Sequence, residues 1–187
     1  MSDTSDFLII GGGIVGCASA YYLSKDNVEC LLVERGEINR GGTAASAGSL
    51  HVQMWSGEMR REDTIASDFI AVKLEAARMW QLLEAELGSS LGVRYAGGLL
   101  VAESSADVDV AMQLVDYQKK RGLDVEFLGS RELHDMAADL APHLLGAVFC
   151  PMDGSADPLL IGPAYVRHAV RRGARVRTHT EVVAIEP

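Results

Sequence analysis

Three glycines near the amino terminus have the spacing of a nucleotide-binding turn. Gly11, Gly13 and Gly16 form a Gly-x-Gly-x-x-Gly pattern, with Ile14 and Val15 before the last glycine. In such a turn the first glycine permits a tight bend, and the second lets a pyrophosphate approach the backbone. The third lets the following helix lie close to the strand, and the positive end of that helix faces the phosphates. The pattern therefore predicts that the chain binds a dinucleotide.

A carboxylate stands where such a site meets the ribose. Glu34 follows Gly16 by eighteen residues, a position from which it can accept hydrogen bonds from an adenosine ribose. Its charge would repel a 2′-phosphate, so a cofactor carrying that group is not favoured. We expect Arg35, beside it, to lie over the adenine or in solvent. An ordinary glycine turn followed by a solvated glutamate is the alternative.

The stretch after Glu34 distinguishes between two kinds of dinucleotide. The glycine pattern alone fits NAD and FAD equally, and an NAD domain normally runs straight into another helix and strand. Here residues 41–50 are Gly, Ala, Ser and Thr, with one Leu. Small residues and free backbone N–H groups suit a pocket where the chain passes close to a pyrophosphate and a flat ring. We therefore expect FAD, with a flexible loop as the alternative.

The elements around these residues predict an α/β fold with a parallel sheet. An apolar run at 6–10, a helix with small residues at 14–24 and a strand at 28–34 form a βαβ unit. The first strand is expected to be covered on both faces. Asp157, followed by proline, is expected to cap a helix, and strands are predicted at 174–178 and 181–186.

The middle of the chain has a different pattern. Short β-prone runs at 92–95 and 98–102 predict an antiparallel hairpin, followed by further helices and a strand. We expect 1–90 to be the first part of a cofactor domain, 91–150 an inserted α+β segment of a substrate domain, and 151–187 the continuation of the cofactor domain.

Charge, cysteine content and hydropathy argue against nucleic-acid binding, a disulfide framework, a metal site and a membrane-spanning segment. A net charge of -9 and a pI near 5.0 argue against nucleic acid, whose backbone is bound by Lys and Arg. Cys17, Cys30 and Cys150 are far apart in apolar runs, which indicates neither a disulfide framework nor a metal site and favours a reducing compartment. No stretch is apolar enough to span a bilayer, so a cytoplasmic protein is expected.

Several segments together resemble the D-amino-acid oxidase-like flavoproteins, which include glycine oxidase, sarcosine oxidase and dehydrogenase, D-amino-acid dehydrogenase, and subunits of opine and cyanide-forming glycine dehydrogenases. The resemblance rests on residues 7–16, 33–34, 43–50, 157–160, 173–176 and 180–183. Residues 52–150 resemble the family only in the order of their elements.

The resemblance implies a Rossmann-like FAD-binding fold and removal of a hydride from the carbon next to an amine of a small amine or amino acid. The implied cofactor contacts are Gly11, Gly13, Ile14, Val15 and Gly16 at the pyrophosphate, Glu34, Arg35 and Val182 at the adenosine, and Gly42, Thr43, Ala44, Ser46, Gly48, Ser49 and Leu50 at the ribityl chain and flavin ring. His51, directly after them, is the residue we place near the ring. A structural histidine bonded to the backbone is the alternative.

Members of this family are longer than this chain, so the resemblance also implies an N-terminal portion that lacks a C-terminal half. An open sheet is then expected to expose a strand edge and apolar side chains. The residues do not identify the electron acceptor. A hetero-oligomer and association with the inner face of a membrane are both compatible with the resemblance. The alternatives to a flavin enzyme are an NAD-dependent dehydrogenase and a non-catalytic, truncated FAD-fold subunit.

Overall fold

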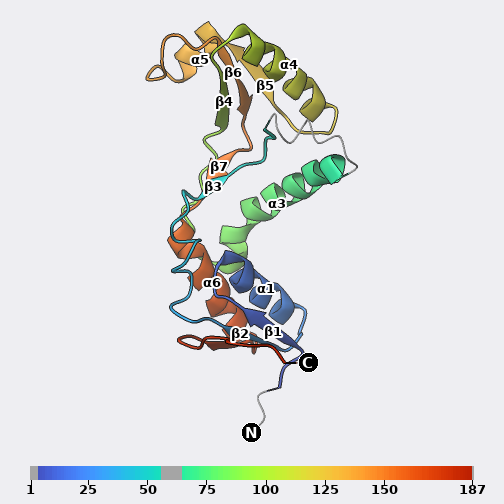
Figure 1. Cartoon of the computed structure of the whole chain (residues 1–187), viewed down its shortest axis with the longest axis vertical. Coiled ribbons are helices and arrows are strands. Elements are labelled where there is room, and N and C mark those ends of the chain that lie inside the picture. Colours follow the sequence, from blue (N-terminus) through green and yellow to red (C-terminus); the bar gives the residue numbers. More distant parts are fainter. Residues whose placement is uncertain (1–3, 56–64, 187) are drawn as a thin grey trace. The chain divides into compact units, whose positions relative to one another are not determined.

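The computed structural model of the chain describes residues 4–55 and 65–186, whose elements are labelled in Figure 1. Contacts divide the chain into two compact units. The first consists of Met1–Gly48, Leu83–Val93 and Ala156–Pro187, and the second of Ser49–Leu82 and Arg94–Ser155. The assignment of a cofactor role to 1–90 and 151–187, and of a substrate role to 91–150, stays a prediction. By contacts, residues 49–82 group with 94–155.

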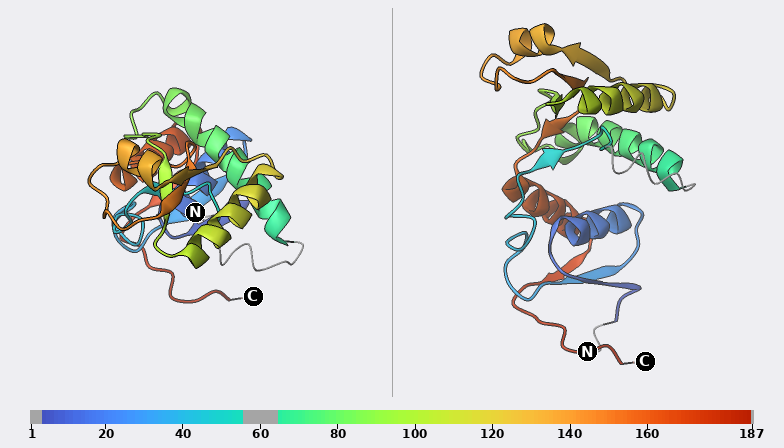
Figure 2. Two further views of the ribbon diagram at one scale, coloured as in Figure 1. Left: turned by 90° about the horizontal axis from the view of Figure 1, so that it is seen from above. Right: turned by 45° about the horizontal axis from the view of Figure 1, so that its top comes forward.

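The first unit is built on a parallel sheet with the strand order β1-β2-β8. Helix α1 (Ile14–Lys25) joins β1 (Phe7–Ile10) to β2 (Cys30–Val33), and α6 (Pro158–Arg171) precedes β8 (Arg175–Arg177). The middle strand β2 is buried along its length. Helices α1 and α6 lie side by side (Figure 2), with the rings of Tyr21 and Tyr165 5.3 Å apart. The predicted α/β fold with its parallel βαβ unit is confirmed.

Strand β1 is at an edge of this sheet, and the prediction that both of its faces are covered is wrong. Among the described strands it pairs only with β2, in a register that places Phe7 opposite Cys30. Phe7, Leu8 and Ile10 remain 51% to 54% exposed. An edge strand with apolar side chains in solvent agrees with the expected open sheet.

The second unit is built on an antiparallel sheet with the strand order β4-β6-β5. Its strands are β4 (Gly98–Ala102), β5 (Glu126–Gly129) and β6 (Gly146–Cys150). Side chains alternate along β6 between two cores. Val148 and Cys150 pack with Leu114 of α4 (Ser105–Lys119), and Ala147 packs with Leu133 of α5 (Ser130–Met136). The long helix α3 (Ile65–Leu87) packs on the first of these cores through Ile70 and Ala77.

Two predictions about strands are wrong. Residues 92–95 and 98–102 do not form a hairpin, because β4 pairs with β6 and Arg94 makes a single bridge to Ser155. Residues 181–186 form no strand, and Val183 and Ile185 are 89% and 79% exposed. The predicted cap is confirmed, since the Asp157 side chain accepts a hydrogen bond of 2.8 Å from the Leu159 amide at the start of α6.

A short antiparallel pair fixes the residues that follow the glycine-rich stretch. Strand β3 (Ser49–Leu50) pairs with β7 (Gly154–Ser155), with Ser49 opposite Ser155. This pairing places the residues around position 50 next to the turn that follows β6. His51, directly after β3, therefore lies near that turn.

Close packing between α1 and the glycine turn depends on Gly16. A β-carbon built on Gly16 would lie 1.9 Å from the Gly11 carbonyl oxygen. This distance is too short for any side chain to be accommodated there. Gly11 itself has a φ angle of 104°, in the region that favours glycine. The helix therefore begins directly against the end of the first strand.

We predict that Gly16→Ala lowers the free energy of unfolding by about 1 to 3 kcal/mol, because the added methyl group overpacks this contact. Gly41→Ala is the matched control, since a β-carbon there meets nothing within 4 Å. The control should stay within about 0.5 kcal/mol of the wild type. Urea unfolding measures both, and equal stability of the two variants would contradict the close contact.

Candidate functional site

The glycine turn lies between β1 and α1 and leaves the start of the helix open to an anion. The Gly11 amide donates to the Val33 carbonyl at 2.8 Å, which ties the turn to the end of β2. Gly13 is the N-cap residue and has no side chain to cap the helix, and the first turn carries no acidic residue, although the Thr43 hydroxyl accepts from the Ile14 amide. The partial positive charge of such a helix start attracts negatively charged groups. The side chain of Val15, in that first turn, is 77% exposed.

Glu34 lies just after β2, and its carboxylate is bonded to the glycine turn. One oxygen accepts a hydrogen bond of 2.6 Å from the Gly12 amide, and the other accepts one of 2.7 Å from the Gly36 amide. The pKa of Glu34 lies below its ordinary value. The hydrogen bond from Gly12 has the largest effect, and the hydrogen bond from Gly36 and the charge of Arg35 add to it, whereas partial burial acts in the opposite direction. Each oxygen of the ionised carboxylate retains a lone pair for a further donor.

The glycine-rich stretch begins beside this turn. The Thr43 hydroxyl accepts a hydrogen bond of 3.0 Å from the Ile14 amide, and the Asn39 amide donates to the Gly12 carbonyl at 2.7 Å. A β-carbon on Gly42 meets nothing within 4 Å. The structure thus brings Gly11 to Gly16, Glu34 and Thr43 together; their contact with a cofactor stays a prediction.

The other predicted cofactor contacts are more exposed or lie elsewhere. Ala44 is half-buried, and Ser46 and Arg35 are exposed. Gly48 has a φ angle of 70° and its carbonyl accepts a hydrogen bond from the Ala156 amide. Val182 follows Thr180, whose amide donates to the Glu34 carbonyl at 2.9 Å. Ser49, Leu50 and His51 belong to the second unit.

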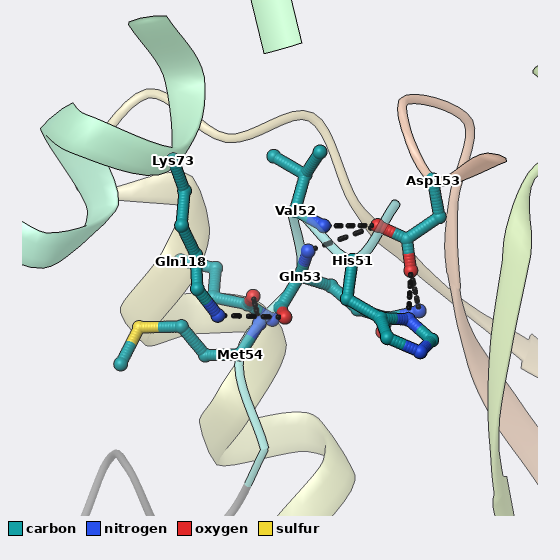
Figure 3. Close-up of polar contacts among 7 residues, drawn as sticks. All are labelled: His51, Val52, Gln53, Met54, Lys73, Gln118 and Asp153. Atoms are coloured by element: carbon teal, nitrogen blue, oxygen red, sulfur yellow. Dashed lines mark hydrogen bonds and ion pairs between the residues drawn. The ribbon is translucent and has the colours of Figure 1, made fainter. Parts of the chain in front are cut away.

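In that second unit, His51 lies next to Asp153, a residue that the sequence analysis missed (Figure 3). The Asp153 carboxylate accepts hydrogen bonds from the Val52 and Gln53 amides and lies 3.7 Å from Nδ1 of His51. Asp153 is buried, whereas the His51 side chain is 52% exposed. Since 101 residues separate Val52 from Asp153, no local pattern could have identified the pair.

A pocket of about 200 Å³ adjoins His51 within the second unit. It is lined by Leu50, His51, Lys73, Trp80, Tyr95 and Met152, among others. The rings of Trp80 and Tyr95 give it an apolar wall, and the Lys73 ammonium donates to the Gln53 carbonyl at 3.3 Å. Such a lining suits a small organic molecule.

Three features bear on other chemistry. Among residues 4–55 and 65–186, no group of three or more His, Cys, Asp or Glu side chains could hold a metal ion. Within that same part of the chain, none of the helices has the length and apolar character needed to cross a bilayer. Cys17, Cys30 and Cys150 are free and buried, and burial, with a smaller effect of Glu34, raises the pKa of Cys17 to about 12. Such thiols are unreactive.

Comparisons with known proteins show which proteins the chain resembles. A family model described as "FAD dependent oxidoreductase" (DAO) matches residues 6–187. Glycine oxidase from Bacillus licheniformis is 31% identical over 186 residues, covering 97% of this chain and 47% of the relative. One of the subunits of opine oxidase from Rhizobium meliloti is 24% identical, covering 97% and 49%. The solved structure of glycine oxidase from Geobacillus kaustophilus superposes with a TM-score of 0.85 at 26% identity, covering 97% and 48%. The chain spans about half the length of these relatives.

Glu34 predicts a pH dependence of stability. Its pKa is lower in the folded chain than the ordinary value of 4.5. Its stabilising contribution is therefore present above that value and is lost as the pH falls through the lower folded pKa. Urea unfolding between neutral pH and about pH 3 should show a smaller loss of stability for Glu34→Gln than for the wild type.

The matched control for this measurement is Glu126→Gln, at an exposed glutamate of β5. This variant should follow the wild-type pH curve. If Glu34→Gln also follows it, the hydrogen bonds to Gly12 and Gly36 do not hold the carboxylate in its ionised form.

Proposed function

The chain belongs to the DAO family of FAD dependent oxidoreductases, and we propose that it is the N-terminal part of an enzyme that oxidises an amine or amino acid. The substrate would lose a hydride from the carbon next to its nitrogen and become the imine. FAD, when bound, supplies the acceptor for that hydride. The protein's own residues bind the cofactor and orient the substrate.

The observation that carries the proposal is the arrangement of the glycine turn, the start of α1, which has no acidic residue in its first turn, and the Glu34 carboxylate in one place. A β-carbon on Gly13 would lie 3.3 Å from the Thr43 hydroxyl, so glycine at this position allows Thr43 to lie close to the helix start and bond the Ile14 amide. Glu34 is ionised and keeps lone pairs for the ribose hydroxyls. These residues fit the adenosine diphosphate half of FAD, and family membership favours FAD over NAD.

The remaining cofactor contacts are proposed from their positions along the chain. The adenosine would be bound by Glu34 with Arg35 and Val182, and the pyrophosphate by the turn with Ile14 and Val15. The ribityl chain and the flavin ring would follow the small residues Gly42, Thr43, Ala44, Ser46, Gly48, Ser49 and Leu50. His51, which comes next, would lie beside the ring.

We place the substrate in the pocket next to His51. Its volume of about 200 Å³ suits an amino acid or a small secondary amine. Lys73 lines this pocket, and its ammonium, which donates to the Gln53 carbonyl, would also attract a carboxylate. Relatives named as a glycine oxidase and as part of an opine oxidase support an amine substrate with a carboxylate group.

A screen identifies the substrate without knowledge of the electron acceptor. The whole enzyme of which this chain is proposed to be a part, loaded with FAD, is mixed, in the absence of oxygen, with glycine, sarcosine, D-amino acids, proline or an opine. Loss of oxidised-flavin absorbance reports reduction by the substrate. No reduction by any of these compounds, in an enzyme that retains FAD, would contradict the proposed reaction class.

A second candidate is an FAD-fold subunit that acts only with a partner. The exposed apolar edge strand β1 favours it, and the opine oxidase relative is named as a subunit. In that case the chain alone would bind FAD but reduce it only after the partner is added.

The cofactor assignment is tested by Gly13→Val. We predict that this variant, incubated with FAD and desalted, retains no flavin absorbance, because the valine side chain occupies the space of the pyrophosphate. Gly129→Val is the control, because Gly129 lies in the second unit, away from the glycine turn in the sequence. A β-carbon at Gly129 meets only Glu132 Oε2, at 3.7 Å. The control should retain as much flavin as the wild type, and equal retention by Gly13→Val would exclude the turn as the pyrophosphate site.

A further inference from the structure

The four residues after the proposed flavin contacts are held by side chains from distant parts of the second unit. Asp153, in the turn after β6, accepts hydrogen bonds of 2.7 Å from the Val52 amide and 3.0 Å from the Gln53 amide through Oδ1. Its other oxygen, Oδ2, accepts one of 3.0 Å from the Gln53 side chain. The same oxygen lies 3.7 Å from Nδ1 of His51. The carboxylate therefore faces backbone on one side and an imidazole on the other (Figure 3).

The space for this carboxylate is built by the surrounding backbone. Asp153 is 2% exposed. A β-carbon on Gly98 would lie 2.4 Å from Oδ2, so glycine at that position admits the carboxylate. The backbone of Asp153 is fixed as well, because its amide donates to Cys150 and its carbonyl accepts from the Gly97 amide at 3.1 Å.

A second buried side chain fixes the next residue. Gln118 of α4 is fully buried, and its Oε1 accepts a hydrogen bond of 2.5 Å from the Met54 amide. The Lys73 ammonium donates to the Gln53 carbonyl at 3.3 Å. Three successive amides, at positions 52 to 54, are thus bonded to two buried side chains.

This network leaves two buried polar atoms unsatisfied within the described part of the chain. Gln53 Oε1 and Gln118 Nε2 are buried and have no hydrogen-bond partner among the described residues. Burying polar atoms in this way opposes folding, and apolar side chains of similar size would avoid that cost. What the polar side chains provide is a fixed position for residues 51 to 54.

We propose that Asp153 is a positioning residue for His51. This inference rests on the proposed function, in which His51 lies beside the flavin ring. One carboxylate oxygen fixes the backbone that carries the imidazole. The other is too far from Nδ1 for a strong hydrogen bond, but its negative charge favours the tautomer with the proton on Nδ1. Nε2 is then unprotonated and accepts a hydrogen bond from the N–H group of an amine substrate.

Two variants separate these effects. Asp153→Asn keeps an oxygen for the Val52 and Gln53 amides but replaces Oδ2 with an N–H donor, so it removes the acceptor that faces His51 and the Gln53 side chain. Asp153→Ala removes both. Asp116→Asn is the matched control, because Asp116 is an exposed residue of α4 in the same unit and pairs with Lys120.

The readout needs neither FAD nor activity. Nitrogen NMR of the ¹⁵N-labelled 187-residue chain reports which nitrogen of neutral His51 carries the proton, and hydrogen exchange reports the protection of the amides at 52 and 53. In the wild type and in Asp116→Asn we expect the proton on Nδ1 and slow exchange. In Asp153→Asn the tautomer should shift toward Nε2–H, while amide exchange changes by less than about threefold. In Asp153→Ala both amides should exchange at least about tenfold faster.

An unchanged His51 tautomer in Asp153→Asn would overturn the proposal. Unchanged amide exchange in a folded Asp153→Ala chain would overturn the part that concerns the backbone, with the amides of α4 and β6 as the check on folding. Flavin retention by the wild type is measured separately. A chain that shows the expected tautomer and binds no FAD would contradict the proposed function but not the position of His51.

Discussion

The hydrogen bond from the Gly12 amide to the Glu34 carboxylate is the interaction on which the candidate cofactor site depends. It joins the turn after β1 to the end of β2, at a distance of 2.6 Å. The contact between Gly16 and the Gly11 carbonyl presses the helix start onto the same turn. Thr43 adds the beginning of the glycine-rich stretch through the Ile14 amide. Without the carboxylate, the turn would keep the bond from the Gly11 amide to the Val33 carbonyl but lose its side-chain bond and the group proposed to bind the ribose.

Both candidate sites use the same physical device. A side-chain carboxylate accepts hydrogen bonds from two backbone amides, and so fixes a segment that no strand pairing holds. Glu34 does this for Gly12 and Gly36, and Asp153 does it for Val52 and Gln53. The Glu34 carboxylate retains lone pairs for ribose hydroxyls, and the Asp153 carboxylate, which also accepts from the Gln53 side chain, faces the imidazole of His51. Glu34 and Asp153 therefore each fix a backbone segment and also have a proposed role in the function.

The sequence predicted the local features and failed on the distant ones. The glycine turn, the βαβ unit and the Asp157 cap follow from spacing within about thirty residues, so pattern and propensity determine them. The pairing of β4 with β6 was missed because it joins residues such as Gly98 and Cys150, which only the fold brings together. Asp153 was missed for the same reason. The exposed face of β1 could not be predicted either, because its apolar run is also typical of a buried strand.

The central claim is that the first unit binds the adenosine diphosphate half of FAD through the glycine turn and Glu34. Calorimetric titration of the chain with ADP, and separately with ADP carrying an added 2′-phosphate, tests it most directly. We expect ADP to bind and the 2′-phosphorylated nucleotide to bind at least about tenfold more weakly, because its charge is placed against Glu34. No binding of ADP, or equal binding of the two nucleotides, would contradict the account.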